Sequence, residues 1–140
     1  MQFMARFGDA THGILRIVAG LLFMQHGVQK LFGWLEGPGP VELFSLMGLA
    51  GVLETFGGLL VAIGLFTRPV AFVLAGQMAV AYFMVHAPQD FFPILNGGEP
   101  AALFCFIFLF LSANGSGAFS VDRAQNRDVA PVRTRDTVTV

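Results

Sequence analysis

The sequence is poor in charge. Charged residues make up 12% of its 140 residues, about half the share that is usual in soluble domains, while 55% are hydrophobic. A disordered chain needs low hydrophobicity and high charge, so this class is excluded. A soluble globule of this size has too little interior to hide so many apolar side chains. We therefore expect a small integral membrane protein.

Further absences narrow the function. A net charge of −1 gives no electrostatic footprint for nucleic acid. The single cysteine, Cys105, excludes an internal disulfide and a Cys-x-x-Cys redox motif. The sequence also lacks a Gly-rich nucleotide loop, a haem attachment motif and the His-x-x-x-His spacing of many metal sites. We therefore predict no metal site and no nucleotide cofactor, so any electrons must come from a bound quinone or a partner protein.

Four apolar stretches are candidates for membrane spans. A helix of roughly 20 residues crosses a bilayer core of about 30 Å. The expected spans are approximately 13–32, 48–66, 69–86 and 100–117. Residues 1–121 are thus predicted to form one domain of the all-α class, an integral membrane four-helix transmembrane bundle. Residues 122–140 are polar and are interpreted as a cytoplasmic, largely disordered tail.

Arginine and lysine are distributed unevenly between the two ends of this bundle. With four spans, the N-terminus, the second loop and the tail share one side, whose arginines are Arg6, Arg68, Arg123, Arg127, Arg133 and Arg135. The opposite side is acidic, and Lys30 at the end of the first span is its only basic residue of this kind. Because cytoplasmic loops carry the excess of Lys and Arg, both termini are predicted to be cytoplasmic.

The polar residues inside the spans are few, which makes them candidates for function. Ionisable groups in a bilayer are costly and usually face the interior of a bundle. On the first span, Arg16 and Lys30 share one helical stripe with Gly20 and Gly27. On the second, Glu54 lies in a stripe of small residues, which let helices approach closely. We therefore expect Glu54 to face another helix rather than lipid.

Alternating span directions bring further polar side chains to the depth of Glu54. Lys30 and His26 lie near the outer end of the first span, and Tyr82 and His86 near the outer end of the third. Such a set beside apolar walls could bind a quinone headgroup, and histidine is suited to proton transfer near neutral pH. In this hypothesis Glu54 handles protons with Lys30 as its partner, and His26 and Tyr82 donate hydrogen bonds to the quinone.

The candidate site residues fall into two groups, and structural explanations compete with both. The catalytic candidates are Glu54, His26 and Lys30, and the cofactor-binding candidates are Tyr82, His86 and Arg16. Glu54 and Lys30 could instead form a purely structural ion pair. Arg16 could extend to the lipid headgroups or pair with Ser112 and Asn114 near the inner side. A histidine in such a helix could be an ordinary core residue.

Four short segments, in order along the chain, resemble the DoxX family of small bacterial four-helix membrane proteins. Residues 15–33 contain Leu-Arg and then Gln-His-Gly-Val-Gln-Lys. Residues 53–68 begin Leu-Glu-Thr-Phe-Gly-Gly and end Gly-Leu-Phe-Thr-Arg. Asn-Gly-Gly-Glu at 96–99 and Gly-Ser-Gly-Ala-Phe-Ser-Val-Asp at 115–122 complete the set. One departure is Ala118, since a basic residue is common there in the family.

The resemblance implies an oxidoreductase-associated protein of the bacterial inner (plasma) membrane. The family includes subunits of a thiosulfate:quinone oxidoreductase and partners of redox-stress enzymes, and many members have no assigned reaction. We therefore expect a quinone-interacting subunit of a membrane oxidoreductase system, with the bilayer and other membrane or redox subunits as partners. The alternative is a non-catalytic structural or accessory subunit of a larger membrane complex. Transport fits less well, because four helices without repeats leave little room for alternating access. A homo-oligomer stays open, as does catalysis by the chain itself.

Overall fold

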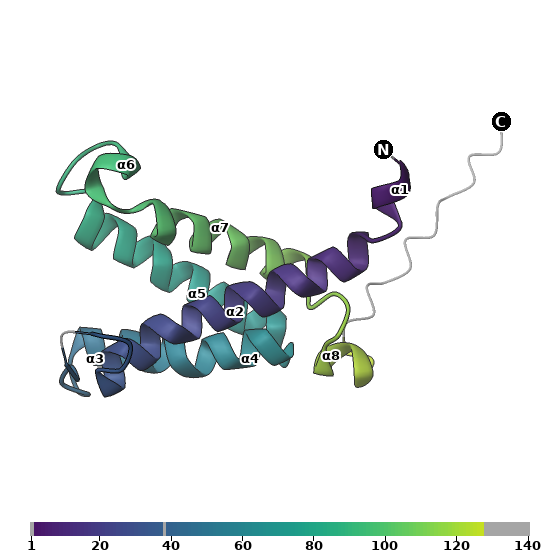
Figure 1. Ribbon diagram of the computed structural model, residues 1–140, viewed down its shortest axis with the longest axis horizontal. Coiled ribbons are helices and arrows are strands. Elements are labelled where there is room, and N and C mark those ends of the chain that lie inside the picture. The colour runs from purple at the N-terminus through teal and green to yellow at the C-terminus, as the bar shows by residue number, and fades with distance from the viewer. Residues whose placement is uncertain (1, 38, 128–140) are drawn as a thin grey trace.

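The computed structural model describes residues 2–37 and 39–127, and all regular structure within these ranges is helical (Figure 1). The elements are α1 (Gln2–Ala5), α2 (Gly8–Phe32), α3 (Leu46–Val52), η1 (Leu53–Gly57), α4 (Gly58–Ile63), α5 (Thr67–Ala81), η2 (Tyr82–His86), α6 (Pro93–Asn96), α7 (Glu99–Asn114) and α8 (Val121–Ala124). The segments η1 and η2 are π-helical turns, so that α3–η1–α4 and α5–η2 are each one continuous rod. The all-α prediction is confirmed.

Two of the described rods are long and apolar enough to cross a membrane, judged by length and composition. They are Leu46–Ile63 and Thr67–His86. The helix α7 is apolar but has 16 residues, fewer than a typical span. The helix α2 has 25 residues and carries Arg16 and Lys30 along its length. Helical rods therefore occupy most of the four stretches that the sequence marks as apolar.

The rods are arranged as two pairs. Helix α2 packs along α3, η1 and α4, and α5 packs along α7. Figure 1 shows that the pairs converge at the end of the molecule that holds α4 and α8, and diverge toward the end that holds α3 and α6. One end of the bundle is therefore closed and the other is open.

Glycines set the close contact within the first pair. A Cβ atom added at Gly27 of α2 would lie 2.4 Å from the backbone nitrogen of Thr55, and one at Gly20 would lie 2.5 Å from that of Ala62. On the facing rod, a Cβ atom at Gly58 would lie 2.7 Å from the nitrogen of Met24. The two backbones thus meet across small residues, as in other membrane helix pairs. Gly20 and Gly27, which share a stripe on the first span, therefore face the second rod.

The hydrophobic core fills the closed half. Phe23 of α2 is 1% exposed, and its ring meets that of Phe108 of α7 edge-on, with centroids 4.8 Å apart. Leu74 of α5, Leu111 of α7 and Val61 of α4 complete the buried contact between the pairs. Aromatic rings in this geometry gain energy beyond the area that they bury. The core therefore joins the two pairs near their crossing and leaves the other half free to diverge.

Arg16 closes the converging end of the bundle. Its guanidinium is fully buried and donates to the backbone carbonyl oxygens of Val61, Ala62, Ser116, Ala118 and Phe119, at 2.5–3.1 Å. The first two are carbonyls of the last turn of α4, and that of Val61 also accepts from the backbone nitrogen of Gly64 at 3.0 Å. The sequence suggested Ser112 and Asn114 as partners of Arg16. In the structure the backbone carbonyl of Ser112 accepts from Arg68, and the side-chain amide of Asn114 donates to the backbone carbonyl of Phe110 in its own helix. Backbone carbonyls thus hold a charge for which the sequence suggested side-chain partners.

The segment after α7 also belongs to the bundle. Asp122 of α8 is 4% exposed and accepts hydrogen bonds from the backbone nitrogens of Phe66 (2.9 Å) and Thr67 (2.8 Å) at the start of α5. Its own nitrogen donates to the carbonyl of Gly64. The first residue of the predicted tail is therefore buried and caps a neighbouring helix. Residues 128–140 of that tail lie outside the described residues.

Candidate functional site

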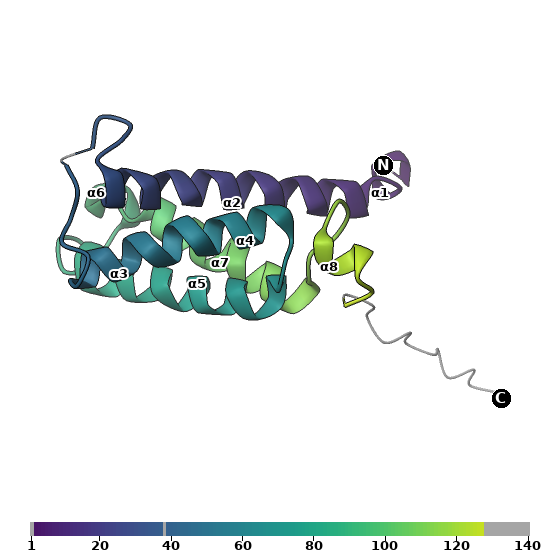
Figure 2. The ribbon, with the colours of Figure 1, turned by 90° about the horizontal axis from the view of Figure 1, so that it is seen from below.

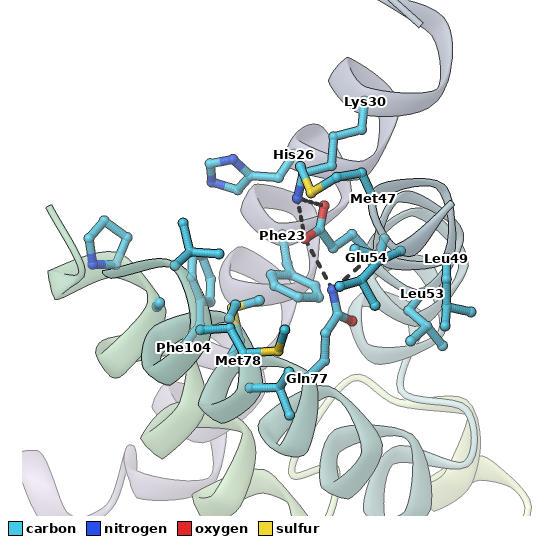
Figure 3. Close-up of a pocket in the computed structure, with 18 of the residues that line it drawn as sticks. Phe23, His26, Lys30, Met47, Leu49, Leu53, Glu54, Gln77, Met78 and Phe104 are labelled. Atoms are coloured by element: carbon cyan, nitrogen blue, oxygen red, sulfur yellow. Dashed lines mark hydrogen bonds and ion pairs between the residues drawn. The ribbon is translucent and has the colours of Figure 1, made fainter. Parts of the chain in front are cut away.

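A cavity lies between the two helix pairs where they diverge (Figure 3). Its volume is about 530 Å³, within the range of small-molecule sites. The walls come from α2, α3, η1, α5, η2 and α7 and are mainly apolar, with Phe23, Leu53, Met78 and Phe104 among the lining residues. The polar or ionisable lining residues are His26, Lys30, Glu54, Gln77 and His86. An apolar cavity with a few converging polar groups is the usual form of a ligand site.

The charged part of the cavity is an ion pair between α2 and η1. The Nζ atom of Lys30 lies 2.5 Å from Oε1 and 2.6 Å from Oε2 of Glu54. The carboxylate side chain is 2% exposed and that of the lysine 26%. Burial of one charge without the other is strongly unfavourable, so each holds its partner in place. The predicted pairing, and the prediction that Glu54 faces another helix, are confirmed.

Gln77 of α5 connects the Lys30–Glu54 ion pair to the second helix pair, which α5 forms with α7. Its Nε2 donates to Oε1 of Glu54 at 3.1 Å and to the carbonyl of Ala50 at 3.4 Å. Its Oε1 is buried and, among the described residues, has no hydrogen-bond partner. A buried acceptor without a donor costs about 1–3 kcal/mol. The sequence hypothesis assigned Gln77 no role, although a lone amide in the middle of an apolar span was the available signal.

The three remaining candidates lie at the open end. His26 is exposed and lines the cavity, with its ring 6.2 Å from that of Phe104 and nearly perpendicular to it. His86 also lines the cavity, and its Nδ1 lies 3.0 Å from the carbonyl oxygen of Asn96. Because a carbonyl only accepts, Nδ1 carries the hydrogen and Nε2 of the neutral ring can accept a proton. Tyr82 is not among the lining residues, although its ring lies 6.4 Å from that of His86.

The structure thus brings together most of the sequence candidates, but not all. Four of them line one cavity: Glu54, Lys30, His26 and His86. Tyr82 does not line it, but its ring is next to that of His86. Arg16 is held at the opposite, closed end of the bundle and does not line this cavity. Within residues 2–37 and 39–127, no three His, Cys, Asp or Glu side chains gather in a way that could hold a metal ion.

Both π-helical turns carry candidate residues. Glu54 lies in η1, and Tyr82 and His86 lie in η2. A π-helical turn adds a residue to the turn and shifts the helix faces beyond it, and such turns are frequent at functional sites. In this bundle they occur where the rods diverge and aim the carboxylate and the imidazole toward the gap between the pairs.

Comparison with known proteins places the chain in a family. The sequence profile of the DoxX family matches residues 12–87, more than half of the chain. A Haemophilus influenzae protein, named only "Uncharacterized protein", is 40% identical over 114 residues, which cover 77% of this chain and 85% of that protein. "Inner membrane protein YqjF" of Escherichia coli is 28% identical over 139 residues, which cover 89% of this chain and 98% of YqjF.

A third relative is similar over most of the chain. "Putative oxidoreductase CatD" of Bacillus subtilis is 28% identical over 116 residues, which cover 78% of this chain and 82% of CatD. No solved structure matches the chain significantly. The match to the family profile and the 40% identity over most of the chain lead to one conclusion: the chain belongs to the DoxX family.

Proposed function

We propose that this DoxX-family chain is a quinone-interacting subunit of an oxidoreductase system in the bacterial inner membrane. The observation that carries the proposal is a cavity with apolar walls and a polar base made by Lys30, Glu54 and Gln77. A quinone has the matching form, since its ring and tail are apolar and its two oxygens accept hydrogen bonds. The names of YqjF, an inner membrane protein, and of CatD agree with this membrane setting and reaction class.

The residues present fit such a ligand in its oxidised and its reduced form. The ammonium of Lys30 has three N–H donors, and His26 and His86 add ring nitrogens to the same cavity. The buried, unpaired Oε1 of Gln77 is an acceptor that a hydroxyl of the reduced form could satisfy. The quinone would supply the redox chemistry, taking two electrons from a redox partner subunit and two protons. Glu54 and the histidines would hold or transfer protons at the ligand's oxygens.

The charge distribution supports an orientation with both termini in the cytoplasm. Helices α1, α8 and the turn between α4 and α5 lie at one end of the molecule (Figure 2), with Arg6, Arg68 and Arg123. The other end carries the acidic residues Glu36, Glu42 and Asp90 in its loops and Glu99 at the start of α7. The positive-inside rule then puts the closed end in the cytoplasm and the cavity in the outer half of the membrane. All four long rods would cross the bilayer in this arrangement.

Quinone binding by a variant with an apolar cavity base tests the proposal. In the double variant K30M/E54L the ion pair is replaced by apolar side chains of similar volume, a change that often preserves folding. We expect the purified variant in lipid nanodiscs to bind a benzoquinone or naphthoquinone at least about tenfold more weakly than the wild type, a loss of about 1.4 kcal/mol. Glu99→Gln, an exposed change at the start of α7, is the control and should bind as the wild type does.

Two results would overturn the proposal. One is a wild-type protein that neither binds added quinone nor carries quinone through purification. The other is equal binding by wild type and K30M/E54L when both are folded, as judged by helical content and thermal unfolding. Fixed-stoichiometry co-purification with a larger complex whose activity survives K30M/E54L would instead favour an accessory, non-catalytic subunit.

A further inference from the structure

One wall of the cavity is also a surface of the protein. Leu49 on the α3 side and Val80 and Met84 on the α5–η2 side line the cavity and are 54%, 51% and 61% exposed. They belong to Leu46–Ile63 and Thr67–His86, the two rods that are long and apolar enough to cross a membrane. In a bilayer, the outer parts of these side chains would touch acyl chains. The interior of the cavity is therefore continuous with the lipid-facing surface between these rods.

The gap between these two rods is closed toward the closed end of the bundle and open toward the opposite end. Toward the closed half of the bundle, Gly57 of η1 packs so tightly on Leu74 of α5 that an added Cβ atom would lie 2.7 Å from the leucine side chain. Toward the open end, α3 and η2 stand on opposite sides of the cavity, as the divergence of the pairs in Figure 1 indicates. Figure 3 shows Leu49 and Leu53 on one side, with the carboxylate of Glu54 directed toward the space between the helices.

The opposite side of the cavity, between α2 and α7, has a different character. His26 and Phe104 bridge these helices with a nearly perpendicular ring contact at 6.2 Å. The imidazole of His26 makes this side of the cavity polar, and its contact with the ring of Phe104 narrows the space between α2 and α7. The exposed lining residues on the α3–α5 side, such as Leu49, Val80 and Met84, are apolar, whereas the α2–α7 side exposes His26.

We propose that the gap between α3–η1 and α5–η2 holds the hydrocarbon tail of a ligand that enters sideways from the bilayer. We call this gap the tail slot; it is lined by Leu49, Leu53, Val73, Val80 and Met84. The inference rests on the proposed function and deepens it: the substrate class is a quinone with an isoprenoid or alkyl tail, not a water-soluble quinone. Its headgroup would reach the Lys30–Glu54 pair while its tail stays in the membrane.

A bulky side chain in the tail slot tests this inference. Val80→Trp places an indole in the slot, and Phe72→Trp, on the same helix, places one at a position that is 65% exposed and does not line the cavity. The probes are one benzoquinone headgroup with a decyl tail and the same headgroup without it, titrated per mole of lipid in nanodiscs. We expect V80W to weaken binding of the tailed probe at least about tenfold, as overpacking of a filled space does. Binding of the tail-less probe should stay as in the wild type, and F72W should bind both as the wild type does.

A photoreactive group at the end of the decyl tail gives a second readout that does not depend on a variant. Cross-linked peptides should come from α3 and from the segment 73–85. Labels concentrated around His26 and Phe104 would overturn the tail slot, as would equal binding of the tailed probe by V80W and F72W. In either case binding of both probes by the wild type would leave the proposed function standing, whereas failure of both probes to bind the wild type would overturn both.

Discussion

Replacement of Arg16 by methionine is expected to destabilise the bundle more than any other single removal of a charge. The guanidinium is 0% exposed and donates to carbonyls of two separate stretches: Val61 and Ala62, and Ser116, Ala118 and Phe119. It therefore ties α2 to the end of α4 and to the segment that follows α7. Methionine retains much of the length of the side chain and none of its donors.

The magnitude follows from the bonds that are lost. A hydrogen bond to a charged group contributes about 1.5–3 kcal/mol, and a buried carbonyl left unpaired adds its desolvation cost. The bonds of Arg16 share one guanidinium, so their contributions do not add. We expect a loss of about 3–5 kcal/mol, roughly the contribution of two such bonds. Arg16→Lys keeps the charge but not the planar fork of donors, and should fall between wild type and methionine.

The assay is unfolding of the purified protein in mild detergent, followed by helical circular dichroism against temperature or added denaturing detergent. The matched control is Arg123→Met, because Arg123 pairs with Asp9 on the surface, where both side chains are more than half exposed. Exposed pairs of this kind contribute about 0–1 kcal/mol. If R16M and R123M unfold at the same point, carbonyl binding by Arg16 does not stabilise the fold and the reasoning fails.

Two further substitutions test the packing and capping described above. Gly27→Ala should destabilise the protein by about 1–3 kcal/mol because the new methyl group meets the backbone at Thr55 and Gly51. The control is Gly76→Ala, which has nothing within 4 Å of the added Cβ atom and should be neutral or stabilising by up to about 1 kcal/mol. Equal unfolding midpoints for the two variants would contradict the close approach of α2 and η1. Asp122→Ala should cost about 0.5–2 kcal/mol through loss of the cap on the first turn of α5, and hydrogen exchange at the amides of Phe66 and Thr67 should become faster; unchanged exchange there would show that the carboxylate does not bind them.

The sequence predicts the ion pair well because the bilayer permits few alternatives. An isolated carboxylate in an apolar span is too costly to face lipid, and the alternating direction of the spans leaves Lys30 as the nearest cation to Glu54. The glycine stripe of α2 is predictable for a similar reason, since small residues at helical spacing have few uses other than close packing. In both cases one local physical cost decides the outcome.

Other parts of the site depend on tertiary packing and could not be predicted. Neither π-helical turn has a sequence signature, yet η1 and η2 set the direction of Glu54 and His86. The role of Gln77 depends on its distance from Glu54 across two helix pairs, which helical periodicity alone does not give. The sequence predicts Asp122 as the first residue of a polar tail. Its partners in the structure are backbone amides, which leave no pattern in a sequence, so its role as a cap could not be predicted.

Arg16 and Lys30 of α2 differ in how their donors are used. Arg16, with no exposed surface, donates to backbone carbonyls at the end of α4 and in the segment after α7, so its donors serve the fold. Lys30 donates to both oxygens of one carboxylate, keeps 26% of its side chain exposed, and borders a cavity in which the Oε1 of Gln77 has no donor among the described residues. A site that only stabilised the fold would pack this space with apolar side chains, since a buried ion pair is seldom more stabilising than such packing. The charged base beside an apolar cavity therefore supports the proposed ligand.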